Sequence, residues 1–350
     1  LEDIGIIRLG FSIGVFNGIG CDVALKTFED TRMLDFCTPV FFASNKMISQ
    51  QKSALGININ FNGVADTSSV LDGKINVVNI WKENPRIEFG KATKEAGQYA
   101  IKSFEAGVVA LKEEKVDVLV TAPINKNNIQ SEAFQFPGHT DYLAQELEGQ
   151  SLMFMVTDTL RVGLLTDHIA VKNVAQSITP ELIRKKVYTI TESLKMDFAI
   201  RRPKIALLGI NPHSGDNGTI GEEDEKILKP VIKELFDTGT LVYGPYSADS
   251  FFGSGAHKKF DAILAAYHDQ GLIPFKTLSF GKGVNYTAGL NRVRTSPDHG
   301  TAFEIAGTGQ ADSSSFKEAV FTGIQVFKNR KEYKELIKNP LQKQKTRRVG

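Results

Sequence analysis

Cysteine is scarce in this 350-residue chain, and its scarcity excludes the disulfide-stapled classes of protein. Cys21 and Cys37 are too few for a disulfide framework and form no Cys-x-x-Cys pair. We therefore expect a protein of the reducing cytoplasm. No apolar run approaches the roughly 18 residues that a membrane-spanning helix requires, and we see no signal-peptide pattern. A membrane location is thus not expected.

An excess of charge of one sign is also missing. The 42 basic and 40 acidic residues leave a net charge of +2. This balance gives no reason to expect nucleic acid or an acidic membrane surface as a partner. The basic cluster at 343–350 is expected to be a solvated tail. The length exceeds that of one typical core, so we expect two domains.

The two common nucleotide-binding fingerprints are absent from the sequence as well. No GxGxxG follows a predicted strand, and GxxxxGK[ST] does not occur. The nearest similar stretch, 14-GVFNGIG-20, has its glycines at unsuitable spacing. A bound nucleotide would therefore occupy neither a Rossmann site nor a P-loop.

What the sequence does contain is an alternation of short apolar runs with helical stretches, which is typical of an α/β protein with a largely parallel sheet. The predicted strands are 117–122, 152–156, 161–166, 204–210 and 261–267. The predicted helices are 91–114, 180–195 and 222–237. Pro180 suits the first position of its helix, and the segment 152–166 should form a hairpin that turns at 157–159.

Three histidines directly follow predicted strands. His168 follows the run 161–166, His213 follows 204–210, and His268 follows 261–267. In open α/β sheets, ligands bind beyond the carboxyl ends of the strands. Three neutral imidazoles meeting there would suit a borderline divalent metal such as zinc. Their spacing matches no metal-binding motif, however, and each histidine taken singly is also typical of a hydrogen-bonded structural residue.

Other polar segments point to the same edge of the sheet. The run 209–224 is rich in Gly, Asn and Ser and is expected to be a loop that presents backbone amides. In 137-PGHTDY-142, His139 and Thr140 precede a helix expected to begin near Asp141, where an anion could bind; an ordinary capped helix start fits equally well. The stretch 281–312 combines several glycines with Asn285, Arg292, Arg294, Asp298 and His299. Arginine suits bidentate capture of phosphate or carboxylate.

Seven segments together resemble one known family. They are TAPINK (121–126), PGHTDYLA (137–144), LLTDHIAV (164–171), LGINPHSGDNG (208–218), GPYSADSFF (244–252), YHDQGLIPFK (267–276) and GVNYTAGLNRVRTSPDHGTAFEIAG (283–307). They cover most of the chain, in order, and resemble the 4-hydroxythreonine-4-phosphate dehydrogenases of pyridoxal phosphate biosynthesis. One departure lies in 14-GVFNGIGCDV-23, where Val15 occupies a usually acidic position and Asp22 replaces a glutamate. This departure weakens the case for a polar role of that loop.

The resemblance implies a fold of two α/β/α domains around a cleft, like isocitrate and isopropylmalate dehydrogenases. The first domain would combine 1–125 with 285–350 and hold the dinucleotide. The second would span 126–284 and carry the metal ligands and the interface of a homodimer with shared active sites. The implied cofactors are NAD or NADP and one divalent metal ion: zinc, magnesium or cobalt.

The resemblance also implies roles for individual residues. The metal ligands would be His168, His213 and His268, the last contributed across the dimer interface. The substrate-binding residues would be His139, Thr140, Lys276, Asn285 and Arg294. The dinucleotide would meet Asp298, Gly300 and Thr301. Our candidates for proton transfer are Lys276 and Asp249.

The implied reaction oxidises 4-phosphohydroxy-L-threonine to 2-amino-3-oxo-4-(phosphooxy)butanoate, a β-keto acid that decarboxylates to 3-amino-2-oxopropyl phosphate. One alternative is a paralogue that oxidises a related acid phosphate, threonate or erythronate 4-phosphate. A metal-dependent hydrolase is another, because three histidines and an open position also suit activated water. A third is a binding protein that kept the fold and lost turnover.

Overall fold

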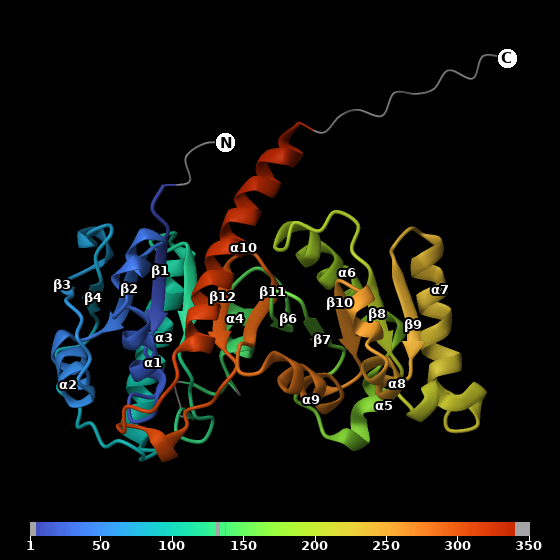
Figure 1. Cartoon of the computed structure of the whole chain (residues 1–350), viewed down its shortest axis with the longest axis horizontal. Coiled ribbons are helices and arrows are strands. Elements are labelled where there is room, and N and C mark those ends of the chain that lie inside the picture. Colours follow the sequence, from blue (N-terminus) through green and yellow to red (C-terminus); the bar gives the residue numbers. More distant parts are fainter. Residues whose placement is uncertain (1–4, 131–133, 137, 340–350) are drawn as a thin grey trace.

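A twelve-stranded sheet runs through the part of the chain that the structure, a computed structural model, describes: residues 5–130, 134–136 and 138–339 (Figure 1). Pro137 and the basic tail at 343–350 lie outside these ranges. The strand order is β3 (Asn62–Val64), β4 (Asn76–Asn79), β2 (Thr38–Ala43), β1 (Arg8–Ser12), β5 (Val118–Thr121), β12 (Val293–Pro297), β11 (Val284–Leu290), β6 (Gly149–Val156), β7 (Arg161–Leu164), β10 (Ala262–Ala265), β8 (Ile205–Leu208) and β9 (Val242–Tyr246).

The sheet consists of two parallel parts joined by antiparallel strands. Neighbours from β3 to β12 and from β7 to β9 are parallel, whereas the pairs β12–β11, β11–β6 and β6–β7 are antiparallel. The prediction of an α/β protein with a largely parallel sheet is confirmed. The division of the chain into two domains at 1–125 plus 285–350 and at 126–284 stays a prediction.

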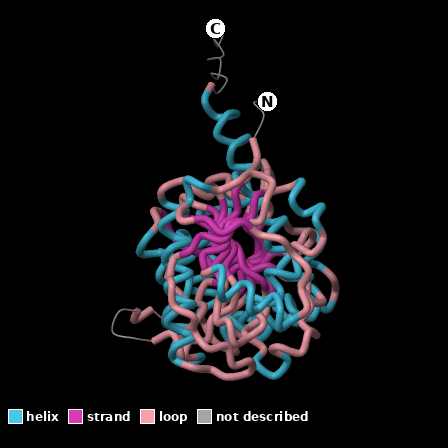
Figure 2. The backbone as a smooth tube through the Cα atoms, turned by 90° about the vertical axis from the view of Figure 1, so that its left-hand side faces the viewer, coloured by secondary structure: helices cyan, strands magenta, loops and turns pink. Residues whose placement is uncertain are grey.

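Helices surround the sheet, whose strands occupy the centre of the molecule in Figure 2. They are α1 (Gly20–Thr27), α2 (Asn45–Leu55), α3 (Lys94–Lys112), α4 (His139–Glu146), α5 (Val174–Ser177), α6 (Pro180–Met196), α7 (Lys229–Asp237), α8 (Ala248–Gly253), α9 (His268–Ser279) and α10 (Ser314–Lys338). No helix of the described ranges has both the length and the apolar character needed to cross a membrane.

The five predicted strands are confirmed as β5, β6, β7, β8 and β10, and the hairpin turning at 157–159 pairs β6 with β7. The helix predicted at 180–195 begins at Pro180, where the hydroxyl of Thr179 accepts a bond from the Leu182 amide. The helix predicted at 222–237 is confirmed over residues 223–237, where a π-helical turn at Asp224–Leu228 continues directly into α7. Pro230 has no N–H to complete a regular helical bond there. The helix expected near Asp141 begins at His139.

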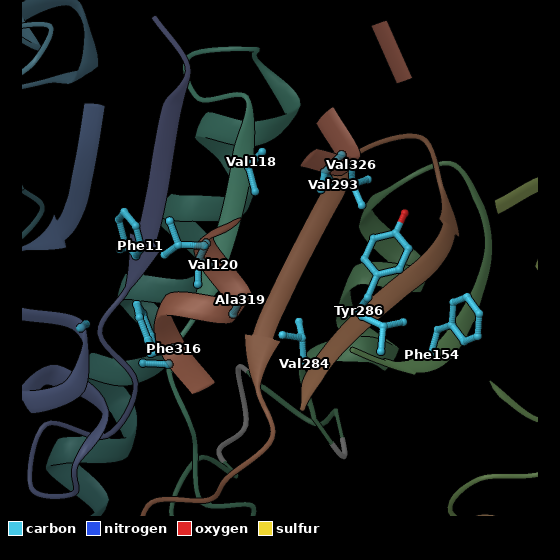
Figure 3. Close-up of a cluster of buried hydrophobic side chains, with 14 of the residues drawn as sticks. Phe11, Val118, Val120, Phe154, Val284, Tyr286, Val293, Phe316, Ala319 and Val326 are labelled. Carbon is cyan, nitrogen blue, oxygen red and sulfur yellow. The ribbon is translucent and has the colours of Figure 1, made fainter. Parts of the chain in front are cut away.

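The core forms where buried strands meet α10. Phe11 of β1 stacks on Phe41 of β2, with ring centroids 4.9 Å apart, and on Phe316 of α10 at 5.9 Å. Figure 3 shows Phe11 and Phe316 on one side of β12 and Tyr286 with Phe154 on the other. Strands covered by helices on both faces need apolar residues at successive positions, which explains the fully buried run of β2.

A buried polar network ties α6, β11 and α10 together behind this core. Asp197, which is fully buried, accepts hydrogen bonds from Ser193 Oγ (2.5 Å), Tyr286 OH (2.6 Å) and Arg330 Nε (2.6 Å). Arg330 Nη2 also donates to Tyr286 OH at 2.8 Å. Burial raises the pKa of Tyr286 well above its usual value, so the phenol keeps its proton and donates it to the carboxylate. The network fixes the end of α6 against the sheet.

Tyr286→Phe should lower the free energy of unfolding by about 1–3 kcal/mol, because it deprives Asp197 of one buried donor. Urea denaturation of both proteins measures the difference. Tyr188→Phe is the control: Tyr188 is 68% exposed, so its loss should stay within about 0.5 kcal/mol. Equal effects of the two changes would show that the buried hydroxyl contributes nothing.

Candidate active site

A cavity of about 270 Å³ lies where β5 and β12 end and β11 begins. The last residue of β5, Thr121, forms part of its wall, and the start of α4 closes one side. Its polar lining consists of Thr121, Lys126, His139, Thr140, Asp141, His168, Asn285, Arg294, Ser296 and His299. Six predicted residues from three separate segments therefore line one cavity: His139, Thr140, His168, Asn285, Arg294 and Gly300.

Arg294 is a buried cation in the wall of this cavity. Its neighbour Thr295 donates to the Ala319 carbonyl on α10, so alternation along β12 directs Arg294 to the opposite face. Arg294 is 2% exposed; its Nε and Nη2 donate to Thr121 Oγ1 at 3.0 and 2.6 Å, and its Nη1 to Thr287 Oγ1 at 3.2 Å. Burial lowers its pKa to about 9, which leaves the guanidinium charged at neutral pH. No carboxylate within the described ranges forms an ion pair with it.

His139 completes the surroundings of this guanidinium and faces the cavity. Arg294 Nη2 lies 3.1 Å from His139 Nδ1. Burial, reinforced by the Arg294 charge, holds the pKa of His139 well below its usual value, so the ring is neutral. Because a guanidinium only donates, Nδ1 accepts and the ring proton sits on Nε2. That Nε2 is buried without a partner among the described residues.

Asn285 presents a second buried polar atom without a protein partner. Its Oδ1 has none in the described ranges, and the side chain lines the same cavity as His139 and Arg294. Buried polar groups are almost always hydrogen-bonded in folded proteins. An N–H donor, a C=O acceptor and a cation without a counter-ion therefore converge on one space, as they would around a polar anionic ligand.

His168 and His268 lie close together within one chain, with ring centroids 5.7 Å apart. Their strands, β7 and β10, are adjacent and parallel, so both histidines emerge at the same edge. Burial, then the nearby Lys126, lowers the pKa of His168. His268 is the first residue of α9, and its Nδ1 lies 2.7 Å from Asp269 Oδ1. That contact leaves Nε2 of His268 free to act as a ligand.

His213 lies apart from this pair. It is exposed and belongs to a left-handed turn after β8, with φ values of 43° to 80° over residues 213–217. It does not line the cavity. Its charge acts on Asp249 of α8, whose pKa is lowered by a hydrogen bond from Ser247 Oγ (2.5 Å) and, more weakly, by His213. Asp249 does not line the cavity either.

The donor set of one chain fits a divalent metal in part. Two imidazoles whose ring centroids lie 5.7 Å apart suit such an ion, but catalytic zinc sites in proteins usually have three protein ligands. Within the described ranges, no group of three or more His, Cys, Asp or Glu side chains is placed to hold a metal. The three-histidine site therefore stays a prediction.

Of the residues expected to meet the dinucleotide, one lines the same cavity. Lys276 Nζ forms an ion pair with Asp298 Oδ1 at 3.0 Å, and burial raises the pKa of Asp298. Gly300 lines the cavity, whereas Lys276, Asp298 and Thr301 do not. The Thr301 carbonyl accepts from the Ile19 amide at 2.9 Å and thereby holds the glycine loop at 14–20.

That glycine loop contributes packing to the site. A Cβ on Gly18 would come within 2.6 Å of the Thr301 carbonyl oxygen, so glycine allows the close approach. Val15 is fully buried in the core. Asp22, 1% exposed, forms an ion pair with Lys26 at 3.2 Å without good hydrogen-bond geometry. Both unusual residues therefore face inward.

Several residues of the cavity were missing from the sequence-based set. Thr121, Lys126 and Asp141 belong to quoted segments but had no assigned role, and Thr287 had none either. A signal existed for Thr121, because a polar residue near the end of an apolar strand marks the edge where ligands bind. Nothing in the sequence indicated that Thr121 would accept hydrogen bonds from Arg294.

Comparison with known proteins assigns this chain to a family. The family model described as Pyridoxal phosphate biosynthetic protein PdxA matches residues 35–323. The chain belongs to the PdxA family. It is 47% identical over 340 residues to the 4-hydroxythreonine-4-phosphate dehydrogenase of Bacteroides thetaiotaomicron, covering 97% of this chain and 93% of that protein. The resemblance seen in the sequence is confirmed, and the chain is a dehydrogenase.

Other relatives support the fold, and one of them is named after a different substrate. The crystal structure of a 4-hydroxythreonine-4-phosphate dehydrogenase from Burkholderia phymatum is 32% identical, with a TM-score of 0.75, and the match covers 92% of this chain and 98% of that one. A protein of Oceanobacillus iheyensis, provisionally named D-threonate 4-phosphate dehydrogenase, is 32% identical over 91% of this chain and 97% of its own.

Arg294→Ala should weaken binding of a phosphorylated hydroxy acid by about 2–4 kcal/mol, because it removes a charge-assisted donor from a buried site. Arg294→Lys should recover part of the loss, since a point charge replaces a fork of donors. Calorimetric titration measures both affinities. Arg184→Ala, which removes an exposed arginine paired with Glu234, is the matched control. Unchanged affinity in Arg294→Ala would remove this residue from the site.

Proposed function

We propose that this chain oxidises 4-phosphohydroxy-L-threonine with NAD or NADP to 2-amino-3-oxo-4-(phosphooxy)butanoate, which decarboxylates to 3-amino-2-oxopropyl phosphate in pyridoxal 5'-phosphate biosynthesis. The observation that carries the proposal is the buried guanidinium of Arg294, charged and without a carboxylate partner, in the wall of a cavity. The name of the relative from Bacteroides thetaiotaomicron contains a phosphorylated substrate, and the phosphate group of such a substrate is an anion that Arg294 could bind.

In this proposal, four side chains hold the phosphate end of the substrate: Arg294, His139, Thr140 and Asn285. Arg294 supplies charge, and His139 supplies the unpartnered Nε2–H inferred from its bond to Arg294. Thr140 lies in the first turn of α4, where the helix dipole favours an anion. Holding one end of a short molecule fixes its reacting carbon within the cavity and lowers the entropic part of the barrier.

Proton transfer and dinucleotide binding are assigned to neighbouring residues. Lys276, held by Asp298 at 3.0 Å, would also contact the substrate, and Lys276 and Asp249 are the candidates for proton transfer. Asp298, Gly300 and Thr301 would bind the dinucleotide. Gly300 supports this because it lines the cavity that holds the substrate residues. A dinucleotide there would lie beside the reacting carbon.

The chemistry of the two cofactors complements these residues. A divalent metal (zinc, magnesium or cobalt) supplies Lewis-acid polarisation of an oxygen, and NAD(P) accepts hydride. His168 and His268 would hold the metal together with His213. Since one chain brings only His168 and His268 together in the described ranges, we propose a homodimer in which the site is completed between two chains.

The compartment proposed is the cytoplasm. Cys21 and Cys37 are both free and buried, and burial raises the pKa of each thiol, that of Cys37 to about 12. Such thiols stay protonated and unreactive, which is compatible with a reducing environment.

Oxidation of D-threonate 4-phosphate is the second candidate function. The provisional name of the Oceanobacillus iheyensis relative, 32% identical, favours it. The two substrates differ at the amino group, while the phosphate grip at Arg294 serves both. A metal-dependent hydrolase is not proposed, because the family consists of dehydrogenases.

The purified chain, supplied with a divalent metal and NAD, should reduce NAD when 4-phosphohydroxy-L-threonine is added. The measurement is the appearance of reduced nicotinamide absorbance, and kcat/KM is compared with that for D-threonate and D-erythronate 4-phosphate. Arg294→Ala should lower kcat/KM for all three. A higher kcat/KM for threonate 4-phosphate would move the assignment to the second candidate, and no reduction with any of them would refute both.

His168→Ala and His268→Ala should each be inactive and contain little metal, yet regain activity when mixed under conditions that exchange subunits. If His268 crosses to the other chain, each mixed dimer has one intact site. Half the dimers are then mixed, and activity approaches about one quarter of the unmodified protein.

The closeness of His168 and His268 within one chain makes this test decisive. If both hold metal for their own chain, the pair will not complement even when exchange is verified. His168→Ala mixed with His213→Ala then becomes the pair expected to regain activity. Metal content of each variant, measured by atomic emission, separates a lost ligand from a lost catalytic step.

A further inference from the structure

A second cavity, of about 310 Å³, lies at the edge of the sheet opposite the candidate active site. The active site adjoins the last residue of β5, Thr121, whereas this cavity adjoins the residues just before β5 and β12 begin. Figure 3 shows Val118, Val293 and Val326 together at this end of the strands, far from Val284 at the other. The cavity is large enough for a small molecule.

Cations dominate the lining of this second cavity. The turn between β11 and β12 contributes Arg292, and α10 contributes Arg330, Lys331 and Lys334. The carboxylates in the lining are Glu114 and Asp117. Four cations and two carboxylates line the space, and Arg330 is also paired with Asp197 behind the lining, so the three carboxylates leave a net charge of +1, which favours an anion.

Arg330 is the buried anchor of this site. It is 5% exposed, and its Nε and Nη2 are bound to Asp197 and Tyr286 on the inner side. Its Nη1 forms no hydrogen bond with any described residue, while the side chain lines the cavity. The inner contacts hold the guanidinium plane in place, so a ligand would meet a pre-oriented donor.

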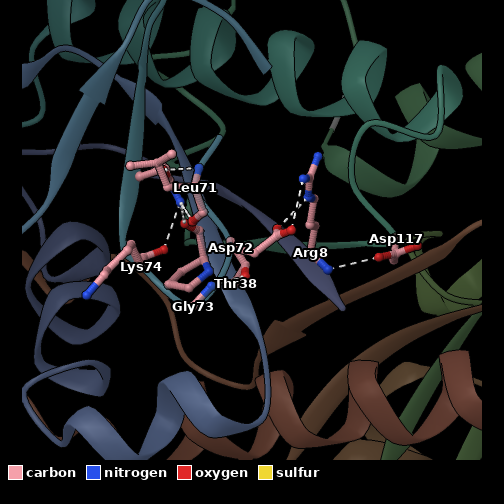
Figure 4. Close-up of polar contacts among 9 residues, drawn as sticks. Arg8, Thr38, Leu71, Asp72, Gly73, Lys74 and Asp117 are labelled. Atoms are coloured by element: carbon pink, nitrogen blue, oxygen red, sulfur yellow. Dashed lines mark hydrogen bonds and ion pairs between the residues drawn. The ribbon is translucent and has the colours of Figure 1, made fainter. Parts of the chain in front are cut away.

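The two lysines are the cations left without carboxylates. Arg292 is paired with Glu114, at 2.7 Å from Nη1 to Oε1. Asp117 accepts from the Arg8 backbone amide at 2.8 Å, as Figure 4 shows, and burial raises its pKa. Neither Lys331 nor Lys334 forms an ion pair within the described ranges; Lys331 Nζ lies 5.0 Å from the Phe327 ring centroid.

We propose that this cavity binds a phosphate group, either inorganic phosphate or that of a small phosphate ester. Arg330 Nη1 and the ammonium groups of Lys331 and Lys334 would donate to its oxygens, and the anion would offset the excess positive charge of the lining. The ring of Phe327, also in the lining, would contact the organic part of an ester. The site is separate from the substrate phosphate grip and does not depend on the proposed function.

Titration calorimetry of the full-length chain with inorganic phosphate tests this proposal. The unmodified protein should bind two phosphates per chain, one at Arg294 and one here. Lys331→Ala/Lys334→Ala should lose one site or weaken it at least tenfold, and kcat/KM should not change. The matched control is Lys317→Ala/Lys328→Ala, which removes two lysines of the same helix outside the cavity lining and should leave both sites intact.

A second titration, with phenyl phosphate, identifies the source of the phosphate. Tighter binding of phenyl phosphate than of inorganic phosphate, abolished in Lys331→Ala/Lys334→Ala, supports an ester; equal binding supports free phosphate. Two unweakened sites in that variant, or the same loss in Lys317→Ala/Lys328→Ala, would overturn the proposal. Circular dichroism shows whether each variant is folded. Lys334→Glu, a single substitution at the surface, should cause the same loss or weakening of one phosphate site.

Discussion

The burial of one positive charge, that of Arg294, which no carboxylate of the described ranges pairs with, organises this protein. Removing an ion from water costs several kcal/mol unless the protein supplies hydrogen bonds in its place. Arg294 donates such bonds to Thr121 on β5, Thr287 on β11 and His139 at the start of α4. The hydrogen bonds of one guanidinium thus connect three elements at the same point. The charge itself stays uncompensated, and an anionic ligand can supply the compensation.

The antiparallel strands β11 and β6 make this arrangement possible. They separate two parallel parts of the sheet, and β12 beside them carries Arg294 next to the end of β5. Since β11 runs against β12, the start of β11 and the end of β12 lie at the same edge. Asn285 therefore lies opposite Ser296, and both line the cavity; Arg294, near the start of β12, lines it as well through its long side chain. The other edge of the same strands holds the cationic cavity formed with α10.

The histidines show how strand order decides which side chains meet. β10 lies between β7 and β8, so His268 emerges beside His168. His213 follows β8 on the other side of β10, and its left-handed turn leaves it exposed near Asp249. Three similar positions in the sequence thus give a pair and a separate residue. Such a difference matters for a metal, which requires its ligands around one point.

The sequence by itself determined the α/β class, five strands, the start of α6 at Pro180 and the family, because apolar periodicity, capping and local motifs are properties of neighbouring residues. It also placed the polar residues at strand ends. It did not reveal β11 and β12 within 281–312, because the polar residues and glycines of these largely buried strands interrupt the apolar run that predicts a strand.

Only the tertiary structure decided that Arg294 donates to Thr121, 173 residues away, and that His139 lines the same cavity. Those contacts depend on which strands become neighbours, and pairing across such distances is set by the packing of the whole sheet.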